Sequence, residues 1–234
     1  MKKIILCGYN WPGCKSLEKL LLENNNVYVY THKSPWHICS LADFCKLKNV
    51  AYTYDKISVQ NLPFKPDLII SIYYRYLIGQ DVINRANGSA FNLHPSLLPK
   101  YKGCSSITWA MINGEEYSGF SYHYLTKDID SGNIIFQSKE KIYGFDTQET
   151  LYNRIMFNAM DAFNDVLRLV SEGYKGLPQI GESSFFPRGC PYDGEINPSW
   201  DLSKKHRFIR AMTNPPYPPA KYRGNIIHKI DDLT

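Results

Sequence analysis

The chain has 234 residues, 44% hydrophobic and 21% charged, which suits one globular domain or one domain with a small appendage. Its net charge of +5 comes without a run of several adjacent basic residues, so a nucleic-acid-binding protein is disfavoured. The six cysteines form no CxxC pair, and no apolar run has transmembrane length. We therefore expect no metal, no nucleic acid, no membrane segment and a cytoplasmic location.

The first part of the chain alternates short apolar runs with stretches of helical periodicity. We expect strands at 3–9, 26–31, 49–55 and 67–74, and helices at 14–24 and near 40–47. This alternation predicts an α/β fold, Rossmann-like, with a mostly parallel sheet and helices on both faces. The turn GYNWPG (8–13) lacks the GxGxxG spacing, which disfavours an NAD-dependent oxidoreductase.

Alternating apolar and polar residues return at 89–95, 119–126 and 133–142, and they predict three further strands. A helix is expected at 105–115, with Ser105 or Ser106 as N-cap, and a long helix at 147–172 that ends at Gly173. From about 181 the chain becomes rich in Pro, Gly and aromatic residues. We therefore expect a main domain of residues 1–180 and a small C-terminal β/loop subdomain of residues 181–234.

The run FNLHP (91–95) places a carboxamide and an imidazole together at the end of a strand. Asn92 and His94 are two residues apart, so they share one face, and Pro95 ends the regular pairing. Such a pair suits attack on a carbonyl, because an amide stabilises the developing oxyanion and an imidazole accepts a proton. The alternative is a hydrogen-bonded structural pair where strand meets loop.

A second polar element is KDIDSGNII (127–135), which combines two carboxylates with a turn. One carboxylate beside His94 would orient the imidazole and stabilise its protonated form. Asp128 and Asp130 both remain candidates, because the spacing does not choose between them, and either residue could instead only cap the turn.

The run FNLHPSLLPKYKG (91–103), followed by DIDSG (128–132), resembles the folate-dependent formyltransferases over roughly residues 1–180. The resemblance places the catalytic triad of that family on Asn92, His94 and Asp130. It implies that N10-formyltetrahydrofolate donates a formyl group to an unprotonated amine without a metal. Asn92 would bind the oxyanion, His94 would accept the amine proton, and Asp130 would orient His94.

The resemblance also implies a pterin site formed by the loop after the fourth strand and the loop before Asp130. The matching residues are Tyr73, Tyr74, Arg75, Tyr76, Leu77, Lys127 and Asp128. Aromatic packing is the alternative role for the tyrosines, and an exposed surface cation is the alternative for Arg75.

The tail resembles that of nucleotide-sugar N-formyltransferases in the regions PRGCPYDGEIN (187–197) and FIRAMTNPPYPPA (208–220). This implies an amino-deoxy sugar substrate linked to a nucleoside diphosphate, such as dTDP-4-amino-4,6-dideoxyglucose, in making a surface sugar such as O-antigen or lipopolysaccharide. Tyr217 would stack on the base, because its ring is held between prolines. The proposed substrate-binding residues are Lys100, Tyr101, Lys102, Gly103, Ser105, Arg188, Arg210 and Tyr217.

Three other interpretations remain open at the level of sequence. The substrate could be glycinamide ribonucleotide, or methionyl-tRNA, although the tail has no basic cluster beyond KKHR (204–207). The chain could also be a non-catalytic nucleotide-binding module that kept the fold. The aromatic tail further suggests a homodimer.

Overall fold

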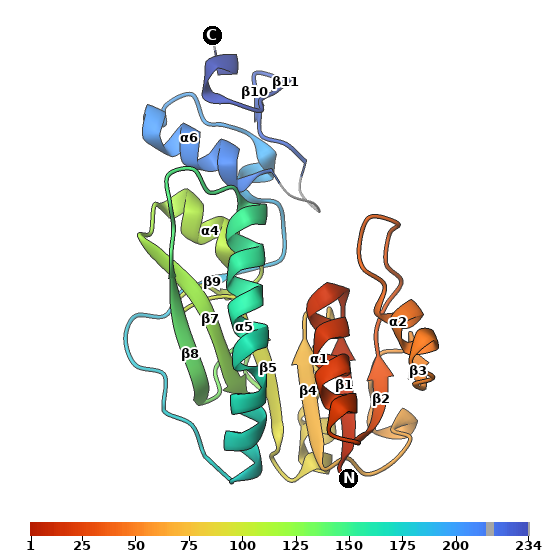
Figure 1. The fold of residues 1–234 in the computed structure, drawn as a ribbon. Helices are drawn as coiled ribbons and strands as arrows, with labels where there is room; N and C mark the ends of the chain where they lie inside the picture. Colours follow the sequence, from red (N-terminus) through yellow and green to blue (C-terminus); the bar gives the residue numbers. More distant parts are fainter. Residues whose placement is uncertain (214–217, 234) are drawn as a thin grey trace. The chain divides into compact units, whose positions relative to one another are not determined.

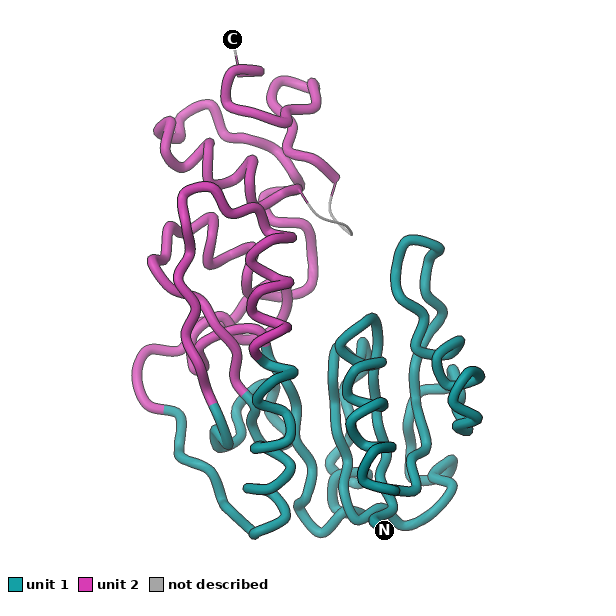
Figure 2. The backbone as a smooth tube through the Cα atoms, in the orientation of Figure 1, with its two compact units in different colours: residues 1–94, 122–136, 159–179 teal, residues 95–121, 137–158, 180–234 magenta. Residues whose placement is uncertain are grey.

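A computed structural model describes residues 1–213 and 218–233 (Figure 1). The chain forms two compact units, and each unit is made of three separate stretches of the sequence (Figure 2). The first unit comprises 1–94, 122–136 and 159–179, and the second comprises 95–121, 137–158 and 180–234. The chain passes from the first unit to the second for the last time between residues 179 and 180, next to the predicted junction near 181. The second unit, however, also contains residues 95–121 and 137–158, which lie earlier in the sequence. The predicted boundary between domains therefore stays a prediction.

The first unit is built on parallel strands whose order reverses beside the first strand. The strands are β1 (Lys3–Gly8), β2 (Asn26–Tyr30), β3 (Tyr52–Thr53), β4 (Leu68–Ile72) and β5 (Ala90–His94). They pair in parallel in the order β3-β2-β1-β4-β5, and β7 (Tyr117–Tyr124) and β8 (Ile134–Lys141) extend the sheet beyond β5. The predicted α/β fold with a mostly parallel sheet is confirmed.

Helical segments cover both faces of this sheet. Ile5 and Cys7 of β1 are fully buried in a cluster with the short helices η1 (Val59–Asn61), α3 (Gln80–Ile83) and η2 (Asn84–Ala86). The alternate residues of β1, Ile4 and Leu6, face the opposite way. That face carries α1 (Asn10–Leu22) and α5 (Gln148–Ser171) (Figure 1), where Ser16 of α1 contacts the sulfur of Met160 of α5 at 3.5 Å.

Element boundaries differ from expectation where a single residue changes the backbone direction. The strand expected at 67–74 ends at Ile72, because Tyr73 has a φ of 62°. The first helix begins at Asn10 rather than 14, so the glycine-containing turn is its first turn. The strand expected at 49–55 shrinks to β3. The long helix expected at 147–172 is confirmed as α5, and Gly173 follows it with a φ of 79°.

Beyond β5 the sheet becomes antiparallel. The Leu125 N–H donates to the Ala90 carbonyl at 2.8 Å, although Leu125 follows β7 and Ala90 begins β5. The Tyr124 N–H donates to the Asn133 carbonyl at 2.9 Å, which closes the connection between β7 and β8. The end of β7 therefore lies beside β5, and the loop 125–133 belongs to the first unit.

The second unit is held by helix packing and an aromatic cluster. Its elements are β6 (Lys102–Gly103), α4 (Ser106–Asn113), parts of β7, β8 and α5, β9 (Phe185–Phe186), η3 (Pro191–Gly194), α6 (Leu202–Ala211), β10 (Lys221–Tyr222), β11 (Asn225–Ile226) and η4 (Ile230–Leu233). Trp109 of α4 stacks on Phe186 with ring centroids 4.6 Å apart, and Trp200 meets Phe208 of α6 at 5.3 Å. Ser105 occupies the N-cap position of α4, but its side chain makes no capping hydrogen bond.

Helix α6 was not expected from the sequence. Asp201 caps it by accepting a 2.7 Å hydrogen bond from the Lys204 N–H, and the KKHR run lies on it. The remaining helix of the first unit is α2 (Leu41–Leu47), capped by Ser40. In the described part of the chain, no helix has both the length and the apolar character needed to span a bilayer.

Candidate functional site

The end of β5 presents Asn92 and His94 on one face of the sheet. Phe91, between Ala90 and Asn92, points to the other face, where its ring lies 6.4 Å from that of Phe163 in α5. His94 is only 4% exposed, whereas Asn92 is half-buried. The alternation in the sequence predicted that Asn92 and His94 share one face, and the structure confirms it. Both side chains lie at the carboxyl end of a parallel strand, which is where such sheets bind ligands.

Asp130 reaches the same place from the loop between β7 and β8. Its φ of 49° is a left-handed backbone conformation, which needs support from its surroundings. Gln179 gives that support, because its amide nitrogen donates to the carbonyls of Asp130 at 2.8 Å and Gly132 at 2.9 Å. Gly132 itself packs so tightly that an added Cβ would lie 1.8 Å from the Tyr124 carbonyl oxygen.

The structure brings His94 and Asp130 together and leaves Asp128 apart. His94 Nδ1 lies 3.4 Å from Asp130 Oδ2, and the two side chains are 5% and 11% exposed. Asp128 is exposed, and its backbone carbonyl accepts a hydrogen bond from the Thr126 hydroxyl at 3.0 Å. A carboxylate at Nδ1 holds the hydrogen on that nitrogen, which leaves Nε2 as the basic nitrogen of a neutral ring. The arrangement can therefore accept a proton.

His123 of β7 completes the cluster, and the sequence reasoning missed it. Its Nε2 lies 3.1 Å from Asn92 Nδ2 and 3.4 Å from Asp130 Oδ1, and it is 1% exposed. The one signal in the sequence was a histidine inside the alternating run 119–126. That signal has no meaning until β7 is known to pair with β5.

The loop after β4 provides the residues expected to bind a pterin. The ring of Tyr74 packs against the sheet core, and its hydroxyl accepts from the Ile57 N–H at 3.1 Å, so this side chain has a structural role. Tyr76 and Leu77 are exposed, and the Arg75 guanidinium lies 5.4 Å from the centre of the Tyr76 ring.

The other expected pterin loop exposes a similar surface. Lys127 and Asp128 are exposed, and Ile129 between Asp128 and Asp130 keeps 40% of its surface accessible. Leu77 and Ile129, with the ring of Tyr76, therefore offer apolar surface of the kind that a flat heteroaromatic ring needs.

Lys100 and Tyr101, expected to bind substrate, line a cavity of about 270 Å³ in the second unit. Both contact Glu115, Lys100 through an ion pair of 3.4 Å and Tyr101 through a hydroxyl hydrogen bond of 2.8 Å. Burial raises the pKa of Tyr101 to about 12. Glu116 also lines this cavity, so it is a poor place for a diphosphate.

Lys102 and Gly103 form β6, which pairs with β9, and Ser105 stands at the N-cap of α4. Gly103 has a φ of 89°, and a Cβ there would meet the Phe186 carbonyl oxygen at 2.2 Å. The Cys104 N–H donates to that carbonyl at 2.8 Å, so this backbone amide already has a partner in the protein. The need for Gly103 thus has a structural explanation.

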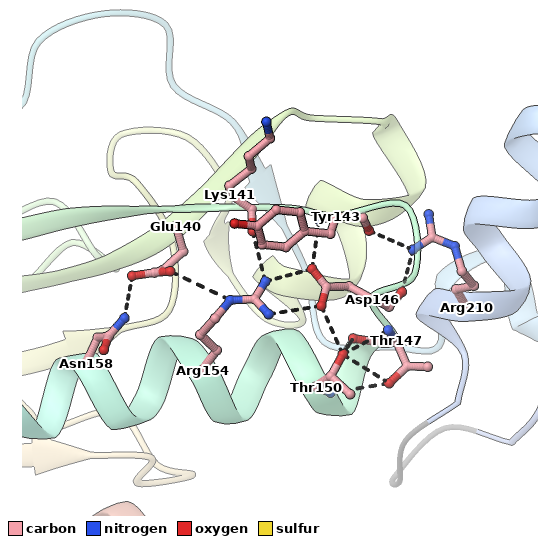
Figure 3. Close-up of polar contacts among 9 residues, drawn as sticks. All are labelled: Glu140, Lys141, Tyr143, Asp146, Thr147, Thr150, Arg154, Asn158 and Arg210. Atoms are coloured by element: carbon pink, nitrogen blue, oxygen red, sulfur yellow. Dashed lines mark hydrogen bonds and ion pairs between the residues drawn. The ribbon is translucent and has the colours of Figure 1, made fainter.

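Arg210 and Arg188 differ in their surroundings. Arg210 Nη1 donates to the carbonyls of Tyr143 and Asp146, as Figure 3 shows, and burial lowers the pKa of its guanidinium. Arg188 is exposed. Tyr217, the expected stacking residue, lies outside the described residues. Within the described ranges, 1–213 and 218–233, no group of three His, Cys, Asp or Glu residues could hold a metal ion.

The mostly parallel α/β sheet carries a carboxamide, a carboxylate and an imidazole at its carboxyl edge, and these groups are chemically able to donate to an oxyanion and to transfer a proton. A family model described as formyl transferase matches residues 3–167, most of the chain. The chain belongs to this formyl transferase family, and the resemblance inferred from its sequence is confirmed.

The similar proteins with a named activity include N-formyltransferases that act on sugars. The chain is 35% identical over 226 residues to GDP-perosamine N-formyltransferase of Brucella melitensis, covering 93% of this chain and 87% of that one. A crystal structure of WlaRD, described as a sugar 3N-formyl transferase with dTDP and 5-N-formyl-THF, superposes with a TM-score of 0.85 at 26% identity, covering 98% and 85% of the two chains. An N-formyltransferase from Helicobacter canadensis, with folinic acid and dTDP-3-aminofucose, has the same fold, with a TM-score of 0.85, 24% identity and coverage of 98% and 87%.

Proposed function

We propose that this protein transfers a formyl group from N10-formyltetrahydrofolate to the amino group of a nucleotide-linked amino-deoxy sugar. The observation that carries the proposal is the meeting of Asn92, His94 and Asp130, from two distant parts of the chain, with His94 Nδ1 3.4 Å from Asp130 Oδ2. The folate would supply a formyl carbon bonded to nitrogen, which an amine can attack. The exposed apolar surface of Leu77 and Ile129 supports this choice of donor.

Each residue of the proposed triad has one task in this reaction. A new C–N bond forms at the sugar amine while the C–N bond to the folate breaks, and the folate nitrogen gains a proton. His94 Nε2 accepts the proton that the amine loses, and Asp130 keeps the ring in the required tautomer and stabilises its charge. The Asn92 amide donates to the formyl oxygen as negative charge develops on it.

A nucleotide sugar is favoured over glycinamide ribonucleotide because similarity to GDP-perosamine N-formyltransferase extends through nearly the whole chain. The family model ends at residue 167, so a relative that shares only the formyl transferase domain would not account for α6 and the short strands that follow. One relative is named for GDP-perosamine, and two similar structures contain dTDP or a dTDP-linked sugar, so the experiment below compares both bases.

The test offers the purified protein GDP- and dTDP-linked amino-deoxy sugars and glycinamide ribonucleotide side by side, each with N10-formyltetrahydrofolate. We expect a kcat/KM for one nucleotide sugar that exceeds the value for glycinamide ribonucleotide by at least about 100-fold, because buried polar contacts left unmade by the wrong substrate are costly. Preference for glycinamide ribonucleotide would refute the substrate assignment. Unchanged activity in Asn92→Ala and His94→Ala would refute the triad.

A further inference from the structure

His123 lies directly across from Asn92 in the sheet. The Leu125 N–H donates to the Ala90 carbonyl at 2.8 Å. Because the two strands are antiparallel, His123, two residues before Leu125, faces Asn92, two residues after Ala90. Residues that face each other in this way have side chains on the same side of the sheet. The contact of 3.1 Å between Asn92 Nδ2 and His123 Nε2 is therefore built into the pairing of β5 with β7.

The backbone fixes which ring nitrogen of His123 carries hydrogen. Nδ1 lies 2.9 Å from the Tyr124 carbonyl oxygen, and because a carbonyl only accepts, Nδ1 must donate. In a neutral ring Nε2 then has a lone pair and accepts from the Asn92 amide. His123 thus holds one N–H of the Asn92 nitrogen, which fixes the plane in which the second N–H lies.

One carboxylate, that of Asp130, faces both histidine rings. Asp130 Oδ1 is 3.4 Å from His123 Nε2, while Oδ2 of the same carboxylate is 3.4 Å from His94 Nδ1, and the two rings have centroids 6.5 Å apart. A hydrogen on His123 Nε2 would compete with His94 for Asp130 and would turn the donating side of the Asn92 amide away. With the hydrogen on Nδ1 alone, His123 accepts from Asn92 and leaves Asp130 to His94.

We propose that His123 is a positioning residue that sets the orientation of the Asn92 carboxamide, so that its second N–H meets the formyl oxygen. This inference rests on the proposed function and adds a fourth residue to its machinery. His123 acts through Asn92 and does not itself touch the reacting atoms.

Two substitutions distinguish the role of Nδ1 from the role of Nε2 in the His123 ring. In His123→Asn the side chain keeps a donor for the Tyr124 carbonyl but loses the acceptor for Asn92, whereas in His123→Gln an oxygen replaces Nε2 as acceptor. We expect His123→Asn to lower kcat about 100-fold, the usual effect of a misplaced oxyanion donor, with the KM for folate changed less than about twofold. His123→Gln should recover roughly tenfold of that loss, and exposed His206→Asn should behave as wild type.

A double substitution asks whether His123 works through Asn92. In an Asn92→Ala background, His123→Asn should cause no further loss in kcat, because the group it positions is gone. A full, multiplicative loss in that background would overturn the proposal, as would equal activity of His123→Asn and the wild type.

Nitrogen NMR of the histidine rings shows which nitrogen of His123 carries hydrogen, independently of any activity measurement. In the wild-type protein, the signal that disappears in His123→Gln should show a protonated Nδ1 and an unprotonated Nε2 at neutral pH. A ring protonated at Nε2 would overturn the proposal, even if the variants prove too unstable for kinetics. If the wild type formylates no amine, the proposed function fails, while the NMR result still decides the contact between His123 and Asn92.

Discussion

The position of Asp130 depends on the absence of a side chain at Gly132. A Cβ there would lie 1.8 Å from the Tyr124 carbonyl oxygen, and this atom belongs to the backbone, which cannot rotate away. The same carbonyl accepts the hydrogen bond from His123 Nδ1. We therefore expect Gly132→Ala to displace the Asp130 loop and to lower kcat/KM by about 100-fold or more, measured in the formyl-transfer assay.

Gly144→Ala is the matched control, because no atom lies within 4 Å of the added methyl group and the φ of Gly144 is not in the left-handed region. It should retain the kcat/KM of the wild type. Equal activity of Gly132→Ala and Gly144→Ala would show that the Asp130 loop does not need this close packing.

The choice between Asp128 and Asp130 gives a second test at this scale. Asp130→Asn keeps the size of the side chain and removes the charge beside His94, so we expect a loss in kcat of roughly 10²–10⁴-fold. Asp128→Asn, two residues away and exposed, should change kcat by less than about threefold. A larger loss for Asp128→Asn than for Asp130→Asn, in steady-state kinetics, would reverse the assignment.

At the scale of elements, a buried carboxylate anchors the start of α5. The Asp146 side chain is fully buried, and Arg154 of α5 binds it through two hydrogen bonds of 3.0 and 2.7 Å (Figure 3). The Tyr143 N–H and the Thr150 hydroxyl also donate to this carboxylate, at 2.8 and 3.1 Å. Its oxygens are thereby satisfied without water, as burial of a charge requires.

Removal of this anchor should destabilise the protein. We expect Asp146→Ala to lower the free energy of unfolding by about 3 kcal/mol, because it removes the buried carboxylate that Arg154 binds, although Arg154 keeps 30% exposure and an ion pair of 3.7 Å with Glu140. The control is Asp165→Ala on the same helix, which breaks an exposed pair with Arg168 and should cost less than about 1 kcal/mol. Urea unfolding measures both, and equal losses would contradict the account.

The same carboxylate predicts a dependence of stability on pH. Burial by itself would raise the pKa of Asp146, but the hydrogen bonds from Arg154 and Tyr143 and the charge of Arg154 outweigh it, so the pKa lies below its ordinary value. A lowered pKa in the folded state stabilises the fold above the unfolded-state pKa, about 4. This contribution disappears as the pH falls through the folded-state pKa. Unfolding curves of wild type and Asp146→Ala should therefore converge in acid.

At the scale of the whole molecule, sequence periodicity predicts the features that depend on neighbouring residues in the chain, such as the face of a strand or the extent of a helix. The alternation around Asn92 and His94 predicts their shared face, and the apolar positions of α5 predict a helix that Gly173 ends. The end of β4 depended on the left-handed Tyr73, a conformation that an aromatic residue seldom adopts and that no pattern reveals.

Contacts between distant segments could not be predicted from periodicity. The choice of Asp130 over Asp128 came from a family resemblance, because it depends on how the 125–133 loop folds back onto β5. His123 was missed because its meaning depends on which strand lies beside β7. Helix α6 was missed because its proline-rich and aromatic flanks resemble those of a loop.

Transfer of a labelled formyl group tests the central claim most directly. The protein is incubated with N10-formyltetrahydrofolate carrying a ¹³C-formyl group and with GDP- or dTDP-linked amino-deoxy sugars, and the products are analysed by mass spectrometry. We predict that the label appears on the amine of one nucleotide sugar with the wild type, and that transfer falls at least about 100-fold in Asn92→Ala and His94→Ala. The account would be contradicted if no nucleotide sugar acquires the label, or if both variants transfer it at the wild-type rate.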